Sequence, residues 1–258
     1  MNSLLLGFGA SLAAGLCTAI GALPILALPS VSSRLQGIML GFGGGVMLAA
    51  TSFSLIVPGT EAAIAQGYAP FAAALIMVVG ILFGGWSLNF IHARFPHEHF
   101  FKGSEGVNKS NLAKIWLFII AITLHNFPEG LAVGVSFGSG NVHLGLPVAL
   151  GIGLQNMPEG LVVAIALVAQ HYTPAFALRV SLLTGLVEPL GGLVGAGVVS
   201  LGNLVLPWGM AFAAGAMLFV ISDEIIPESH RQGHEQEGTI GVMVGFVVMM
   251  FLDVALSA

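Results

Sequence analysis

A hexapeptide with metal-binding side chains occurs twice in the chain, at residues 125–130 (HNFPEG) and 155–160 (QNMPEG). The two copies agree at four of six positions. In each, an asparagine stands three residues and a histidine or glutamine four residues before the glutamate, so all three side chains share one helix face. Imidazole, carboxylate and amide ligands without thiolate suit divalent ions such as Zn²⁺, Fe²⁺ and Mn²⁺. The residues that the two copies offer are His125, Asn126, Glu129, Gln155, Asn156 and Glu159.

Both copies lie in long apolar stretches of a strongly hydrophobic chain. Of its 258 residues 56 % are hydrophobic and 7 % are charged, whereas soluble domains average about 25 % charged residues. The 36 glycines suit helices that pack closely in lipid through small faces. The composition therefore predicts an all-α membrane protein embedded in the lipid bilayer, with residues 1–258 forming a single transmembrane domain.

The apolar stretches predict eight transmembrane helices, because about 20 apolar residues cross a bilayer once. The first stretch lacks a basic start and is too long for a signal peptide, so we expect it to be a helix of the mature protein. The expected helices are residues 4–28, 35–57, 70–91, 112–138, 143–169, 176–201, 205–226 and 239–256.

The charges predict the orientation of these helices. All seven lysines and arginines fall in alternate connections, and the connections 58–69, 139–142 and 202–204 contain none. By the positive-inside rule the basic side is cytoplasmic and both termini are extracytoplasmic. The loop at about 92–111, which contains histidines, is then cytoplasmic. A net charge of −5 and so few basic residues argue against a nucleic-acid partner, and the single cysteine excludes an intrachain thiolate cluster.

Three glutamates of the expected helices fall near the bilayer centre. Glu129, Glu159 and Glu188 lie close to the middle of residues 112–138, 143–169 and 176–201. Each charge at that depth costs about 2.5–3.5 kcal/mol on insertion scales, and no lysine or arginine lies at that depth. A divalent cation held between the carboxylates supplies the missing counter-charge, so the depth pattern favours a cation site.

A proline adjoins each of these glutamates, at Pro128, Pro158 and Pro189. Proline removes a backbone hydrogen bond and clashes with the preceding turn. We therefore expect the helices to be bent or broken at the midplane, as at the substrate sites of carriers. Met47, at mid-depth of residues 35–57, would add a thioether ligand that favours Zn²⁺ or Cd²⁺.

These motifs resemble the ZIP (Zrt-/Irt-like) metal transporters. The paired hexapeptides on a fourth and a fifth helix carry the resemblance, and the sequences around Met47, Glu188 and residues 223–230 look like the bacterial GufA-like branch. The resemblance covers essentially the whole chain. It implies the ZIP fold, a homodimer in a bacterial inner membrane, and an elevator-like movement of the helices that bear the site.

The resemblance also implies a binuclear metal site and the two ends of a path. Gln155 stands where many members have histidine and Asn156 where some have aspartate, so the second metal position has less negative charge. The first position would use Met47, His125, Glu129, Gln155 and Glu159, and the second Asn126, Glu129, Asn156, Glu159 and Glu188. Entrance positions would be Ser54, Glu61 and Asp253, and exit positions His92, Asp223, Glu224, His230 and His234.

The sequence thus predicts a transporter that moves Zn²⁺ into the cytoplasm and is not an enzyme, with Fe²⁺, Mn²⁺ and Cd²⁺ as further candidate substrates. One alternative is a metal-sensing or structural membrane protein without flux. The other is an intramembrane zinc peptidase, against which the chain has no His-Glu-x-x-His motif.

Overall fold

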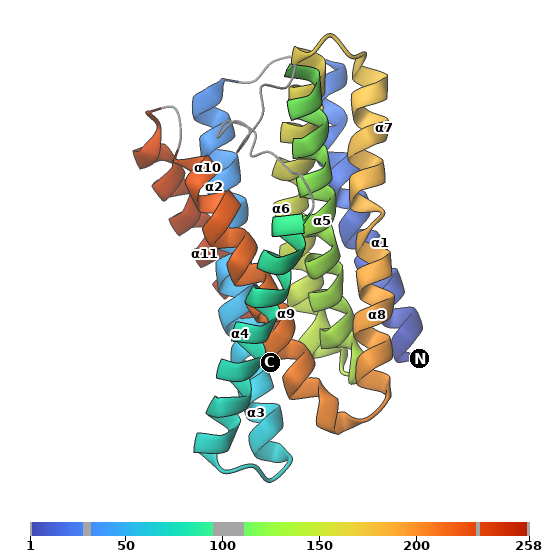
Figure 1. Cartoon of the computed structure of the whole chain (residues 1–258), viewed down its shortest axis with the longest axis vertical. Coiled ribbons are helices and arrows are strands. Elements are labelled where there is room, and N and C mark those ends of the chain that lie inside the picture. Colours follow the sequence, from blue (N-terminus) through green and yellow to red (C-terminus); the bar gives the residue numbers. More distant parts are fainter. Residues whose placement is uncertain (1, 28–31, 95–110, 231–232, 257–258) are drawn as a thin grey trace.

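The computed structural model describes residues 2–27, 32–94, 111–230 and 233–256. Throughout these residues the chain forms helices and short connections (Figure 1), so the predicted all-α class is confirmed. The elements are α1 (Ser3–Ala22), η1 (Leu23–Leu26), α2 (Ser33–Ala49), η2 (Ala50–Ile56), α3 (Val57–Ala65), α4 (Pro70–Arg94), α5 (Asn111–Gly138), α6 (Val142–Ala169), α7 (Pro174–Gly185), α8 (Glu188–Ser200), η3 (Asn203–Val205), α9 (Leu206–Val220), η4 (Ile221–Ile225), α10 (Ile226–Ser229) and α11 (Glu235–Leu256).

Seven helical segments of the described chain are long and apolar enough to cross a membrane, so this is a multi-pass membrane protein. The 28-residue helix α5 is not among them, and its crossing, with the count of eight, stays a prediction. The seven segments are Ser3–Leu26, Ser33–Ala65, Pro70–Ile91, Val142–Ala169, Pro174–Ser200, Leu206–Ser229 and Glu235–Leu256.

Two of these segments contain a π-helical turn. The turn η2 joins α2 to α3 in one continuous rod, and η4 joins α9 to α10. Because Pro58 lies in the first turn of α3, where proline is tolerated, the rod continues to Ala65. The predicted helix 35–57 therefore ends too early, and the predicted connection 58–69 is mostly helix.

The midplane prolines affect their helices differently. Helices α5 and α6 run unbroken through Pro128 and Pro158. The chain leaves the helical pattern only before Pro189, at residues 186–187, and α8 then starts at Glu188. The predicted break is thus found at one proline, where it places a carboxylate in the first turn of a helix.

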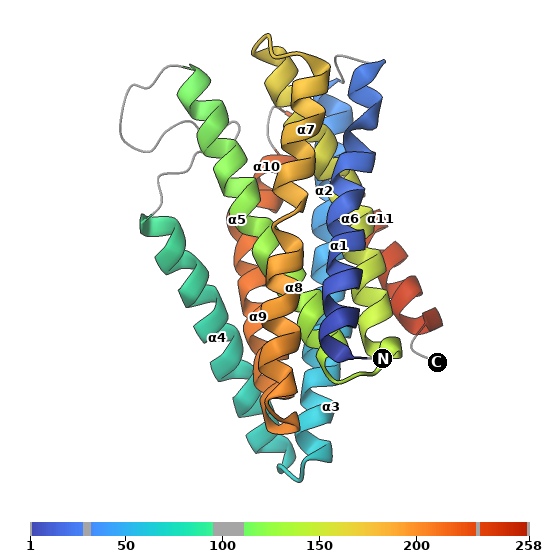
Figure 2. The ribbon, with the colours of Figure 1, turned by 90° about the vertical axis from the view of Figure 1, so that its right-hand side faces the viewer.

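Glycines bring several pairs of helices into close contact, among them α5 with α8 and α4 with α9. A Cβ atom on Gly130 would overlap the backbone of Glu188, so α5 and α8 are in backbone contact there. In the same way a Cβ atom on Gly84 would overlap the backbone of Phe212, which joins α4 to α9. Figure 2 shows α4 beside α9 and α5 beside α8.

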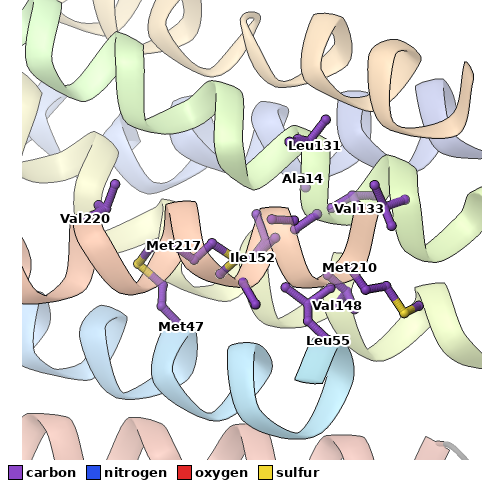
Figure 3. Close-up of a cluster of buried hydrophobic side chains, with 14 of the residues drawn as sticks. Ala14, Met47, Leu55, Leu131, Val133, Val148, Ile152, Met210, Met217 and Val220 are labelled. Carbon is purple, nitrogen blue, oxygen red and sulfur yellow. The ribbon is translucent and has the colours of Figure 1, made fainter. Parts of the chain in front are cut away.

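The main apolar cluster fills the space where α2, α5, α6 and α9 meet. Met47, Leu55 and Ile152 are fully buried in it, together with Met210 and Met217 of α9 (Figure 3). The cluster anchors the α2–η2 rod against the two helices that carry the duplicated hexapeptide.

Candidate metal centre

The eight residues predicted for the metal site are all buried, and none exposes more than 4 % of its surface. They come from α2, α5, α6 and α8. Met47 lies among the apolar side chains of Figure 3, while the other seven form a polar group in the interior. Those seven are His125, Asn126, Glu129, Gln155, Asn156, Glu159 and Glu188.

Hydrogen bonds link the second hexapeptide to the third glutamate. Asn156 donates to Glu188 Oε1 at 2.6 Å and accepts a bond from Gln155. The first hexapeptide approaches the same glutamate through the backbone, because a Cβ atom on Gly130, the neighbour of Glu129, would overlap the carbonyl group and the Cα atom of Glu188. The structure therefore brings both hexapeptides to Glu188.

Helix α1 forms a wall of this group, a role that the sequence did not indicate. The second amide proton of Asn156 bonds the carbonyl oxygen of Ala14 at 2.9 Å. A Cβ atom on Gly15 would lie 3.3 Å from Glu188 Oε1, and one on Gly160 would overlap the backbone of Thr18. Small residues thus let α1 approach both α6 and α8. The large number of glycines in the apolar stretches was the available signal, but it does not tell which helices meet.

His125 lies on the other side of the group, against Glu224 of η4. The distance from His125 Nε2 to Glu224 Oε1 is 3.0 Å, and both side chains are almost fully buried. From the sequence we expect Glu224 at the cytoplasmic end of a helix, where the metal would leave the protein. The structure instead has it in contact with a predicted metal ligand.

Several polar atoms of the group have no hydrogen-bond partner within the described part of the chain. They are one carboxylate oxygen each of Glu129, Glu159 and Glu188, and both side-chain polar atoms of Asn126. Buried polar groups are normally satisfied, so these atoms indicate a missing ligand. Beside them, a void of about 10 Å³ contacts Gln155 and Glu159, which is about the space of one water molecule.

In the conformation described, no three histidine, cysteine, aspartate or glutamate side chains of the described residues converge enough to hold a metal ion by themselves. A metal here needs ligands from the amides or the thioether as well, or a small movement of the carboxylates. The surplus of acceptor oxygens over donors makes the site chemically suited to a cation.

Apart from Glu224, the residues predicted for the entrance and exit have other surroundings. Ser54 is buried in η2 and donates to Asp253 of α11, whereas Glu61 is exposed. Asp223 is half-buried beside Glu224. His230 is 2.9 Å from the Thr239 hydroxyl, and His234 is 3.9 Å from Glu237. The side chain of His92 and the loop residues His97 and His99 lie outside the described part.

Comparison with known proteins adds an independent observation. The family model described as ZIP Zinc transporter matches residues 97–253. The chain is 51 % identical over 251 residues to the zinc transporter GufA of Myxococcus xanthus, covering 97 % of this chain and 99 % of that protein. It is 47 % identical over 243 residues to the zinc transporter ZIPB of Bordetella bronchiseptica, covering 93 % and 78 %. With the zinc transporter ZupT of Chlorobium luteolum the identity is 36 % over 251 residues, and 93 % of each chain is covered.

Proposed function

Because this chain belongs to the ZIP family of zinc transporters, we propose that it moves Zn²⁺ across a bacterial inner membrane into the cytoplasm. The observation that carries the proposal is the group of buried carboxylates with unsatisfied oxygens. In a membrane interior such oxygens must be protonated or must bind a cation. The names of the relatives favour Zn²⁺ among the cations, with Fe²⁺, Mn²⁺ and Cd²⁺ as further candidates.

We place two metal positions at this group, sharing Glu129 and Glu159 as bridging ligands. The amide oxygen of Asn156 already accepts a hydrogen bond from Gln155, so it leaves the second position with little free ligand capacity and no charge of its own. The first position, with the imidazole of His125, is the tighter one. Its ligands are Met47, His125, Glu129, Gln155 and Glu159, and those of the second are Asn126, Glu129, Asn156, Glu159 and Glu188.

The contact between His125 and Glu224 gives the first position a way to load and release. For a metal to bind Nε2 of His125, the proton that Nε2 donates to Glu224 moves to that carboxylate. When the metal leaves, Glu224 returns the proton and again accepts a hydrogen bond from the imidazole, so a buried donor is never left without a partner. Glu224 thereby acts as a positioning residue next to the metal ligands.

We expect the path to run from Ser54, Glu61 and Asp253 to the site and then past Asp223 and His230 to the cytoplasm. The placement of lysine and arginine on one side assigns the cytoplasmic end of this path. The eight crossings, the extracytoplasmic termini and the homodimer remain predictions.

The proposal is tested by uptake of radioactive zinc into proteoliposomes. We expect Glu129→Gln and Glu159→Gln to reduce uptake to the background of empty liposomes, because each removes a bridging charge without changing the size of the side chain. Glu237→Gln is the control, since Glu237 pairs with the exposed Arg34 at the surface. Wild-type uptake by both site variants, in protein that elutes as the wild type does, would show that the site lies elsewhere.

A further inference from the structure

A second cavity of the molecule has no part in the metal site. It is a crevice of about 370 Å³ between the pair α4–α9 and the pair α5–α8. Its walls are Val79 and Phe83 of α4, Leu131 of α5, Val194 of α8 and Trp208 of α9. The volume lies within the range of small-molecule sites, about 300–1,000 Å³.

The chemistry of the walls restricts what can occupy the crevice. All its lining residues are apolar side chains or glycines, and none is charged. Several are also exposed on the outside of the bundle, including Phe83 at 55 % and Val194 at 47 %. These residues belong to membrane-crossing segments, so the crevice opens toward lipid. An apolar chain fits it, and a hydrated ion or a polar solute does not.

The crevice reaches inward from the start of α9. Trp208 lies in the first turn of α9, and tryptophan is favoured at the level of the lipid headgroups. The wall from Val205 to Phe212 rises about 10 Å, at about 1.5 Å per residue, and the ring of Phe212 lies 5.6 Å from that of Phe83. Half of the hydrocarbon core is about 15 Å. The outer part of a hydrocarbon chain that enters beside Trp208 therefore lies in the crevice as far as Phe83.

We propose that this crevice binds one acyl chain of a membrane phospholipid, with the headgroup beside Trp208. The chain contacts all four helices and fills the space between two pairs that are each held together by glycine contacts. It thereby sets the separation of α4–α9 from α5–α8. The proposal does not depend on the metal site.

The test uses a phosphatidylcholine that carries a photoreactive diazirine near the middle of one acyl chain, in vesicles that contain the full-length protein. We expect the label on peptides of α4 and α9, which carry Phe83 and Phe212. Val194→Trp fills the crevice and is expected to reduce labelling about tenfold, which corresponds to about 1.4 kcal/mol and to roughly two buried methylene groups.

Leu193→Trp is the matched control, because Leu193 is the neighbour of Val194 on α8, is 41 % exposed and does not line the crevice. It should label as the wild type does. If Val194→Trp elutes as misfolded protein, Val198→Phe, another wall residue, takes its place with the same expectation. Equal labelling of wall and control variants overturns the proposal. The proposal is also overturned if the wild-type protein is not labelled and a wall variant, but not the control, changes from dimer to monomer. That result would mean that a second copy of the chain fills the crevice.

Discussion

The contact of Gly130 with the backbone of Glu188 makes a sharp prediction about stability and function. An added Cβ atom would overlap the carbonyl group and the Cα atom of Glu188. Backbone cannot rotate away as a side chain can, so α5 and α8 must separate in Gly130→Ala. Overpacking of this kind lowers the free energy of unfolding by about 1–3 kcal/mol.

Gly9→Ala provides the matched control on another helix. Nothing lies within 4 Å of a Cβ atom on Gly9, which is in the middle of α1. There alanine should raise the free energy of unfolding by about 0.5–1 kcal/mol, because glycine loses more conformational entropy in a helix. The two variants should thus differ by about 1.5–4 kcal/mol, or roughly 3–15 °C in Tm.

The assay is thermal unfolding of the two purified variants in the same detergent, followed by zinc uptake in proteoliposomes. Separation of α5 from α8 also moves Glu129 away from Glu188, so we expect Gly130→Ala to slow uptake at a temperature where it is still folded. A Tm for Gly130→Ala at or above that of Gly9→Ala would refute the backbone contact between α5 and α8.

Two further predictions concern polar contacts. Asn156→Leu removes the donor to Glu188 and to Ala14. A hydrogen bond to a charged group contributes about 1.5–3 kcal/mol and one to a neutral carbonyl about 0.5–1.5 kcal/mol, so thermal unfolding should show a clearly lowered Tm. An unchanged Tm would mean that these bonds do not hold the carboxylate. Arg34→Ala should lower the free energy of unfolding by less than about 1 kcal/mol, because the Arg34 side chain is 67 % exposed where it pairs with Glu237. A larger loss of stability in the same assay would show that this ion pair is part of a more extensive network.

Much of the fold and the buried site could be predicted because lipid makes polar residues conspicuous. Burying a charged group in a membrane-spanning helix costs free energy, so residue type and depth alone were enough to single out Glu129, Glu159 and Glu188. The structure buries these three side chains and the amides next to them, and it brings both hexapeptides to Glu188. That they bind metal in two positions remains the proposal above.

The contact of Glu224 with His125 could not be predicted, for a geometric reason. Depth along a helix was counted at the α-helical rise, and η4 departs from that pattern. The same limit applies to the rod formed by α2, η2 and α3, where Pro58 was taken as a connection. Hydropathy also does not reveal which helices pair, so the role of α1 through Ala14 was missed.

The two π-helical turns have a consequence for how this chain tolerates insertions and deletions. Each turn carries the residue that reaches across to another helix, Ser54 in η2 and Glu224 in η4. A π-helical turn holds one residue more than the α-helical turn that it replaces. Deleting a single residue there would restore the α-helix, leave the residues beyond the turn facing nearly the same way, and change the direction in which the residues of the turn itself point. Such a deletion leaves the hydropathy of the segment nearly unchanged but removes the partner of Asp253 or of His125 from its place, so chain length in these turns is under stricter constraint than side-chain type.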